Sequence, residues 1–457
     1  MNGVLARKST AAPSSGSATL RRLLILAAVL IALLAATPLA FAAGGDNAYM
    51  GFALATGLVA LAATRTAEHA PTPSAFWLII VVALLARGAL LFTDPLLSTD
   101  IYRYVWDGRM QAAGINPYRH VPADEALVAL RDAVIYPHIN RADYAVTIYP
   151  PVAQMFFFLV TRFGEGVTAM KLGLLLCEAG TVTILVLLLR RLGRPVTRVV
   201  AYAWHPLPIW EIANSGHIDA LMIALMMTGI WLALGGRRGL GAVAITLGIL
   251  AKPFAAPALA VAWRPWDWKL PLLVALVALL CYAPYLSLGW GVFGFLATGY
   301  VSEEQLNTGD SVWLLALWRL IVGTLPGDVI VYFATSALAL VGMGVLTAQM
   351  ADRSACARLA ALNKLLLLFL FLMPLNYPWY FLVATPFVAL TGGAPAWVIT
   401  LGAVLLQKES WGDWQMPLQV RKSILYGAFL ASCAFAAWQA RRVNATKVMS
   451  NESADTR

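Results

Sequence analysis

Residues 21–41 read RRLLILAAVLIALLAATPLAF, two arginines followed by a run without a single charged residue. A helix of about 20 residues spans the hydrocarbon core of a bilayer, so this stretch is long enough to cross a membrane. It exceeds the apolar core of a secretory signal peptide, which has roughly 7–15 residues, and the next segment, FAAGGDNAYM (41–50), leads directly into another apolar run. We therefore expect the first segment to be retained rather than cleaved.

The composition of the whole chain follows this pattern. Of its 457 residues, 60% are apolar and 12% are charged, whereas soluble domains have about 45–50% and ~25%. Apolar runs of spanning length recur from Arg21 to Arg442, and backbone amides in lipid must be hydrogen-bonded within helices. This predicts an all-α polytopic membrane protein with one domain over residues 22–442. The four cysteines lie far apart without a CxxC pair, so neither a disulfide framework nor a zinc site is indicated.

Basic clusters mark the expected cytoplasmic ends of the helices. The net charge of +10 is explained by lysines and arginines at these ends, which set the orientation of the spans, so no nucleic-acid partner is expected. Neighbouring clusters must be separated by an even number of crossings, which gives about 12–14 helices. Residues 1–21 and 443–457 are then cytoplasmic tails, the first of them disordered. The clusters lie at 190–198, 235–239, 263–269, 352–358 and 439–447.

Two apolar segments do not fit single crossings. Even crossings require residues 240–263 to form two short helices, broken at Lys252 and Pro253 because proline lacks a backbone donor. Residues 151–162 would make about 18 Å of helix against a ~30 Å core, which predicts an interfacial or re-entrant helix. Polar segments then share the outer face. They are a long loop with amphipathic helices at 93–150 and shorter segments at 214–219, 300–311 and 375–381.

The long outer loop contains TDIYRYVWDGRMQAAGINPY (99–118). Ser98 and Thr99 are helix-capping residues, and a helix starting there would place Asp100, Arg103 and Asp107 on one face. One interpretation is a salt-bridged ladder that merely closes the end of a membrane helix. The other is a binding ledge, because the surrounding aromatic residues and carboxylates together suit the apolar faces and hydroxyls of a sugar.

The segment WHPLPIWEIANSGHIDALMIAL (204–225) holds a second polar cluster, with His205, Glu211, Asn214, His217 and Asp219. Ionisable groups at membrane depth are costly and often line a cavity, which makes His217 and Asp219 site candidates. For His205 a hydrogen bond within the fold is the simpler role. The His-x-Asp pair lacks a third metal ligand nearby, so no metal site is predicted.

Two further segments combine polar and aromatic groups. Lys252 in LAKPFAAP (250–257) either extends to the membrane interface or neutralises an anion at the membrane boundary, for which a lipid phosphate is the natural choice. The segment LNYPWYF (375–381) is either part of an aromatic belt or a surface for a sugar ring.

Taken together, these segments are similar to the GT-C superfamily of polytopic glycosyltransferases, and most of all to bacterial mannosyltransferases that use polyprenol-phosphate mannose. A more distant likeness is to the enzyme that adds the first mannose to glycosylphosphatidylinositol. The resemblance extends from about residue 85 to 390. It is carried by the segment 99–118 and by YPPVAQMFF (149–157), HPLPIWEIANSGHIDALM (205–222), LAKPFAAPAL (250–259) and YPWYFLVATPF (377–387).

The resemblance implies a GT-C-like bundle in the inner (plasma) membrane, with its site on the non-cytoplasmic side. The implied activity is inverting transfer of a sugar from a polyprenyl-phosphate donor to a glycolipid or glycan acceptor. Mannose is the first choice, and arabinofuranose or another sugar stays open. Besides the lipid-linked donor, no cofactor or divalent metal is expected, and the partners are membrane lipids, donor and acceptor. The alternative is a secondary transporter or flippase of a lipid-linked or small anionic substrate, since broken helices and charges at membrane depth mark that class.

Residue roles follow from the same resemblance. The superfamily keeps its catalytic base in the first large outer loop, where Asp100 is the matching residue. Paired acids are common in that motif, whereas Ser98 and Thr99 precede a single acid here, which leaves open whether Asp107 takes part. The donor phosphate is expected to bind Lys252 with Arg103 or Arg109. Substrate contacts are expected from Asp107, Asn116, Tyr118, Tyr149, His217, Asp219, Tyr377, Trp379 and Tyr380.

Overall fold

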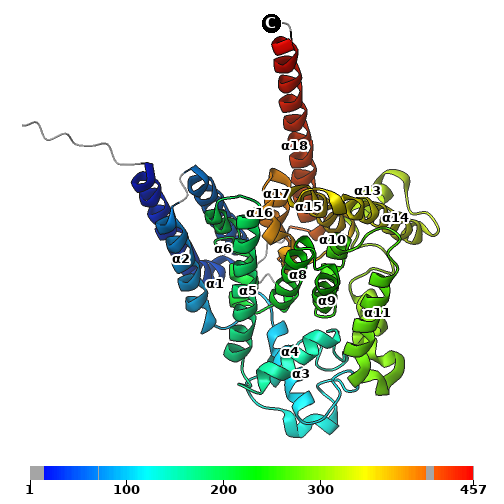
Figure 1. Cartoon of the computed structure of the whole chain (residues 1–457). Helices are drawn as coiled ribbons and strands as arrows, with labels where there is room; N and C mark the ends of the chain where they lie inside the picture. The colour runs from blue at the N-terminus through cyan, green and yellow to red at the C-terminus, as the bar shows by residue number, and fades with distance from the viewer. Residues whose placement is uncertain (1–14, 70–71, 408–415, 456–457) are drawn as a thin grey trace, which may run out of the picture.

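The computed structural model describes residues 15–69, 72–407 and 416–455 (Figure 1). Within these ranges every regular element is a helix, and several helices have the length and composition of membrane spans. Both observations confirm the all-α polytopic membrane fold expected from the sequence.

Among the described residues, seven helical segments are long and apolar enough to cross a membrane. They are α1 (Ser15–His69), α2 (Pro73–Leu91), α5 (Val167–Arg191), α11 (Lys269–Tyr282) with its continuation η6 (Ala283–Phe293), α14 (Asp328–Ala348) with η8 (Gln349–Asp352), α15 (Ala355–Leu372) and α18 (Leu418–Asp455).

Shorter apolar helices lie between the long ones, so the expected count of about 12–14 crossings stays a prediction. They are α4 (Pro151–Thr161), α8 (Asp219–Leu234), α9 (Arg238–Ile249), η5 (Pro253–Ala258) with α10 (Leu259–Ala262), α13 (Trp313–Val322), η9 (Pro378–Ala384) with α16 (Thr385–Leu390), and α17 (Ala394–Gly402) with η10 (Ala403–Leu406). The remaining elements are α3 (Asp100–Ala112), η1 (Glu125–Leu130), η2 (Tyr136–His138), η3 (Val196–Val199), α6 (Val200–Ala203), α7 (Pro206–Pro208), η4 (Ile209–Asn214), η7 (Leu296–Tyr300) and α12 (Val301–Glu303).

Helix α1 consists of two helices that meet at a kink. Gly45 has φ 58° and ψ −147°, a conformation that is open to glycine but strained for other residues. The segment FAAGGDNAYM therefore joins two apolar helices directly, as expected. Residues 1–14 of the expected disordered tail lie outside the described residues. Residues 15–21 are helical, which corrects that part of the prediction, because α1 already begins at Ser15.

The predicted break at Lys252 and Pro253 is confirmed. Helix α9 ends at Ile249, and Lys252 is extended, with φ −159° and ψ 132°, as expected for a residue before proline. The 3-10 helix η5 then begins at Pro253. The short helix expected over 151–162 is also present as α4, which begins at Pro151 after an extended Pro150.

Ion pairs join three of the basic clusters at one end of the bundle. Arg238 donates to Asp267 at 2.8 Å, and Arg264 donates to Asp352 at 3.0 Å. These contacts bring the clusters at 235–239, 263–269 and 352–358 together, as their common role in setting orientation requires.

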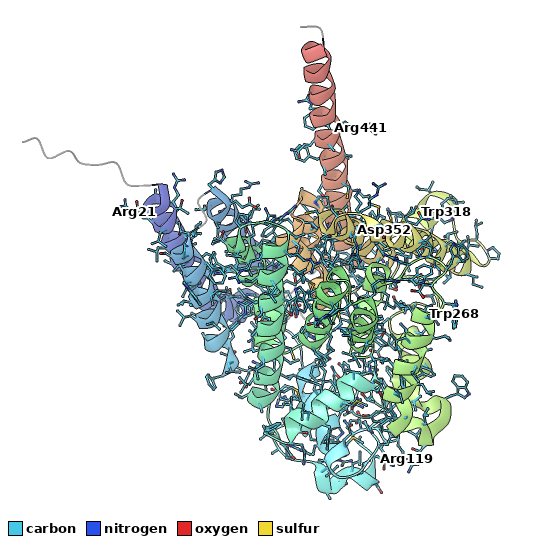
Figure 2. All side chains as sticks on the ribbon, in the orientation of Figure 1. Arg21, Arg119, Trp268, Trp318, Asp352 and Arg441 are labelled. Atoms are coloured by element: carbon cyan, nitrogen blue, oxygen red, sulfur yellow. The ribbon has the colours of Figure 1, made fainter. Side chains whose placement is uncertain are left out.

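The two ends of the molecule differ. Figure 2 shows Arg21, Asp352 and Arg441 toward one side and Arg119 toward the opposite side. Helices α3 and α4 lie near Arg119, whereas the C-terminal part of α18 projects away from them (Figure 1). Helix α3 was expected to be amphipathic, yet residues from Ile101 to Gly108 are all buried, because α4, α5 and η2 pack against it.

Candidate active site

A polar cavity of about 380 Å³ lies where four distant parts of the chain meet: the loop 93–150, Lys252 before η5, residues 300–304, and residues 377–380 around the start of η9. Its wall combines carboxylates, cations, an amide and aromatic rings, the groups that bind and orient polar ligands. Six of the residues singled out in the sequence line it, namely Asp100, Tyr149, Lys252, Tyr377, Trp379 and Tyr380.

Asp100 is the first residue of α3, so its carboxylate lies at the positive end of the helix dipole. Its Oδ1 accepts a hydrogen bond of 2.7 Å from Nδ2 of Asn140, and its side chain is 17% exposed. The expected capping is only partly found, because the backbone amide of Asp100 donates to Oγ of Ser98 at 3.3 Å, whereas the Thr99 side chain makes no capping bond. Asp100 is therefore held at one oxygen while it faces the cavity.

His217 lies behind Asp100 and does not line the cavity, and its expected contact with substrate stays a prediction. The side chain is 1% exposed, with Nδ1 3.8 Å from Oδ2 of Asp100 and Nε2 3.3 Å from Oε2 of Glu211. Burial and the nearby charge of Lys252 lower the pKa of His217 well below its usual value, so the ring is neutral. The neutral ring of His217 thus separates the carboxylate of Asp100, which lines the cavity, from the buried carboxylate of Glu211.

The turn that carries His217 depends on Gly216. This residue has φ +73°, and a Cβ placed on it would lie 2.3 Å from Cδ1 of Ile101 in α3. Only glycine allows the turn to approach the helix this closely. The Gly-His sequence therefore fixes the position of His217 relative to Asp100, which precedes Ile101.

Lys252 lies on the cavity wall, next to the buried side chain of Asp219. Its Nζ donates to Oδ2 of Asp219 at 2.5 Å and lies 5.0 Å from the ring centroid of Tyr380. Asp219 is fully buried and does not line the cavity, and its expected contact with substrate stays a prediction. An ammonium group has three donors and Asp219 occupies one of them, so Lys252 can also bind an anion.

An apolar groove of about 440 Å³ adjoins the polar cavity. Phe254, Leu296, Leu306, Phe369 and Met373 are among its lining residues. The groove and the cavity share a wall that includes Tyr149, Lys252, Tyr300, Glu304 and Tyr380. A ligand with a polar head and a long apolar tail could therefore occupy both spaces, with its junction beside Lys252.

Arg141 brings a second cation to the cavity. Its Nε donates to Oε1 of Glu303 at 2.6 Å, and the hydroxyl of Tyr144 donates to Oε2 of the same carboxylate at 3.3 Å. Burial by itself lowers the pKa of Arg141, but the hydrogen bond and charge of Glu303 outweigh it and raise the pKa above the usual value. Arg141 is thus a permanent cation on the wall that also carries Asp100.

Aromatic rings form another side of the cavity. Trp379 stacks on Tyr377 with ring centroids 4.5 Å apart, and it also stacks on His217 at 4.3 Å. The hydroxyl groups of Tyr300 and Tyr380 are hydrogen-bonded to each other. Flat rings with polar edges offer the stacking surface and donors that a sugar ring requires.

Arg103 and Asp107 lie outside the cavity, and their expected roles in binding stay predictions. Arg103 donates to Oδ1 of Asp107 at 2.8 Å and to the carbonyl of Ala145 at 3.0 Å. The other oxygen of Asp107 accepts from Gln154 at 2.9 Å, and Asp107 is fully buried. The predicted ladder is therefore half correct, because Arg103 pairs with Asp107 but Asp100 turns toward the cavity. The pair fastens α3 to the loop behind it and to α4.

Arg109 also serves the loop rather than the cavity. Two residues beyond Asp107, it forms ion pairs with Asp132 at 2.6 Å and with Glu165 at 3.2 Å. Each carboxylate lies in a separate segment that the arginine ties to the end of the helix.

Asn116 and Tyr118 likewise support the loop. Oδ1 of Asn116 accepts from the backbone amide of Tyr118 at 3.1 Å, and the Tyr118 hydroxyl donates to the carbonyl of Tyr149 at 2.7 Å. Neither side chain lines the cavity, and their expected substrate contacts stay predictions. Through this bond, however, Tyr118 holds the backbone of Tyr149, which does line it.

Several cavity residues were not identified from the sequence: Asn140, Arg141, Tyr144, Tyr300, Glu303 and Glu304. Two of them are adjacent acids in YVSEEQLNTGDS (300–311), a segment placed on the outer face but given no role. Placing two consecutive carboxylates beside a membrane span costs free energy unless they have partners. This pair of acids was therefore the feature of the sequence that could have indicated a site here. Across the described ranges, no group of three or more His, Cys, Asp or Glu side chains is arranged to hold a metal ion.

Comparison with known proteins shows a similarity to mannosyltransferases over part of the chain. Residues 48–267 match the family model for the alpha-(1->6)-mannopyranosyltransferase N-terminal domain. A segment of 184 residues is 28% identical to alpha-(1->6)-mannopyranosyltransferase A of Mycobacterium tuberculosis and covers 39% of this chain and 34% of that protein. The chain thus matches about a third of the length of this curated relative. No solved structure matches the chain.

The two matches confirm the resemblance to GT-C mannosyltransferases that the sequence motifs indicated. The matched range 48–267 includes Asp100, Asn140, Arg141 and Lys252. It ends before the segments at 300–304 and 377–380, which complete the cavity from the C-terminal half of the chain.

Proposed function

We propose that this protein transfers a sugar, preferably mannose, from a polyprenyl-phosphate donor to a glycolipid or glycan acceptor on the non-cytoplasmic side of the inner membrane. The observation that carries the proposal is the wall shared by the polar cavity and the apolar groove, with Lys252 on it. A polyprenyl tail in the groove and a sugar in the cavity would place the connecting phosphate beside this ammonium group.

The proposed reaction is a single displacement at the anomeric carbon. The acceptor hydroxyl attacks that carbon while its proton passes to the carboxylate of Asp100, which acts as the general base. The bond between the anomeric carbon and the phosphate oxygen breaks, and the polyprenyl phosphate leaves with the electron pair. One displacement inverts the configuration at the anomeric carbon.

The leaving phosphate needs electrostatic stabilisation rather than a proton. Lys252 and Arg141 are the two cations on the cavity wall, and both keep donors beyond those used by their carboxylate partners. Arg141 takes the place that the sequence-based hypothesis gave to Arg103 or Arg109. The mechanism requires no metal or other cofactor besides the lipid-linked donor.

The proposed orientation rests on charge. The joined basic clusters lie at the end of the bundle marked by Asp352, opposite the end marked by Arg119 (Figure 2). Basic residues prefer the cytoplasmic side, so the loop 93–150 and its cavity would face away from the cytoplasm.

A transfer assay with the purified protein in liposomes tests the proposal. Polyprenyl-phosphate mannose labelled in the sugar is supplied with a mannoside acceptor, and a nucleotide-linked mannose serves as the control donor. We expect a new glycosidic bond with inverted configuration from the lipid-linked donor and none from the control. Labelled donor that crosses the bilayer without forming such a bond would instead support the transporter alternative.

A further inference from the structure

Glu304 follows the short helix α12 and lies on the wall shared by the cavity and the groove. The residue is 6% exposed. A carboxylate at this depth loses most of its hydration, so it requires partners that replace the lost hydrogen bonds. The described structure provides them from two other segments of the chain.

Both carboxylate oxygens of Glu304 are hydrogen-bonded. Oε2 accepts from Nδ2 of Asn376 at 2.6 Å, and Oε1 accepts from the hydroxyl of Tyr377 at 3.0 Å. A carboxylate has about four acceptor sites, so these two bonds fix its orientation and leave capacity for a ligand. The side chain is therefore held in one position without being saturated.

The orientation of Asn376 is set by a buried lysine of α18. Nζ of Lys422 donates to Oδ1 of Asn376 at 2.6 Å and to the carbonyl of Ser311 at 2.6 Å. Lys422 is 1% exposed. Because a cation faces the amide oxygen and an anion faces the amide nitrogen, only one orientation of the Asn376 amide satisfies both.

The ammonium group of Lys422, the amide of Asn376 and the carboxylate of Glu304 thus form a hydrogen-bonded chain. Two buried opposite charges are connected through a neutral group that hydrogen-bonds to each, which offsets the desolvation of both. All of these residues lie beyond residue 267, outside the range matched by the family model. The comparison therefore assigns no role to them.

We propose that Glu304 binds a pair of neighbouring sugar hydroxyls in the cavity and selects the sugar, and that Lys422 positions Glu304 through Asn376. A carboxylate accepts from hydroxyl groups but repels a phosphate, so its ligand is the sugar rather than the carrier phosphate beside Lys252. A substrate that lacks one of the two hydroxyls would leave a buried acceptor unpaired, which is a strong source of discrimination. This inference rests on the proposed function, because it concerns the sugar of the same reaction.

The test compares the wild-type protein with Glu304→Gln, using polyprenyl-phosphate mannose and analogues that each lack one ring hydroxyl. A hydrogen bond to a charged group contributes enough to change kcat/KM by about 10- to 150-fold. We expect the wild type to lose this factor with one or two of the analogues. In Glu304→Gln, activity with mannose should fall while the difference between mannose and those analogues shrinks to a few-fold.

Variants of the supporting residues test the positioning role. Lys422→Met should reduce discrimination in the same direction, and Lys422→Arg, which keeps the charge, should restore part of it. Tyr377→Phe removes one hydrogen bond to Glu304 without changing the ring, so it serves as a second probe if Lys422→Met does not fold. Lys364→Met is the matched control, because Lys364 is an exposed lysine on α15.

The experiments distinguish a failure of the proposed function from a failure of the role proposed for Glu304. If the wild type forms no glycosidic bond from any polyprenyl-phosphate sugar, the proposed function is wrong. If the wild type transfers mannose and Glu304→Gln keeps the full discrimination among analogues, the role of Glu304 is wrong. Unchanged discrimination in both Lys422→Met and Tyr377→Phe would contradict the positioning role.

Discussion

Nδ1 of His217 lies 3.8 Å from Oδ2 of Asp100, and the opposite nitrogen of the same ring lies 3.3 Å from the buried carboxylate of Glu211. The ring is neutral, because burial lowers its pKa. The His217 ring therefore separates the carboxylates of Asp100 and Glu211 without adding a charge. Asp100 faces the cavity, and the imidazole of His217 lies on its other side. This arrangement has consequences for stability as well as for the chemistry.

The first prediction concerns pH. A histidine held neutral in the folded state binds protons more readily when unfolded, so the folded state loses stability as the pH falls through the usual histidine pKa near ~6.5. His217→Phe keeps a ring against Trp379 but removes the titrating group. We expect the melting temperature of the wild type to fall more steeply than that of His217→Phe between about pH 7 and 5. Parallel profiles of the two proteins would contradict the buried, neutral state.

The second prediction concerns Lys252 and the donor. Lys252→Met should raise KM for the polyprenyl-phosphate donor, but it also leaves Asp219 buried without its cation, which typically costs about 3–5 kcal/mol of stability. Combining it with Asp219→Asn removes the unpaired charge. The double variant should regain stability yet still use the donor poorly, as measured by thermal unfolding and by donor titration. Recovery of normal donor use by the double variant would show that Lys252 acts only as a partner of Asp219.

The third prediction tests the close approach of Gly216 to α3. Gly216→Ala should destabilise the protein by about 1–3 kcal/mol, because it combines a strained φ with a contact of its new Cβ to Ile101. Ile101→Val removes the Cδ1 atom involved, so the double variant should regain part of the loss. Thermal unfolding in detergent measures both effects. An equal loss in the single and double variants would contradict the contact.

The fourth prediction concerns orientation. Asp143 is exposed in the loop 93–150, and Arg353 is exposed at the end that carries the basic clusters. In a protein whose native cysteines have been replaced, Asp143→Cys should react with an impermeant thiol reagent in intact cells, whereas Arg353→Cys should react only after the membrane is opened. The reverse pattern would place the cavity on the cytoplasmic side.

Local signals in the sequence were sufficient for several elements of the fold. A capping pair before Asp100 indicated the start of α3, and the proline after Lys252 indicated the break between α9 and η5. Both depend on residues that are adjacent in the chain. The family resemblance then indicated Asp100 and Lys252 as site residues, and both line the cavity.

Partners far apart in the chain could not be predicted in this way. Glu303 and Arg141 are separated by 162 positions, and no pattern in either segment indicates the other. Arg109 was expected at the donor phosphate, but Asp132 and Glu165 from other segments pair with it. The pair of Arg103 with Asp107 is local to α3, whereas its bond to the carbonyl of Ala145 crosses 42 positions. Tertiary packing decides whether a charged side chain faces a cavity or a structural partner, and local sequence patterns do not predict this packing.

The most direct test of the proposed mechanism compares Asp100→Asn with Asp143→Asn in one transfer assay with purified protein. Both changes remove a carboxylate from the same loop, but only Asp100 lines the cavity. General bases typically contribute about 10²–10⁴-fold to the rate, so we predict a fall of that order in kcat for Asp100→Asn, with donor binding retained and Asp143→Asn close to the wild type. Turnover by Asp100→Asn near that of the wild type would contradict the assignment of Asp100 as the base.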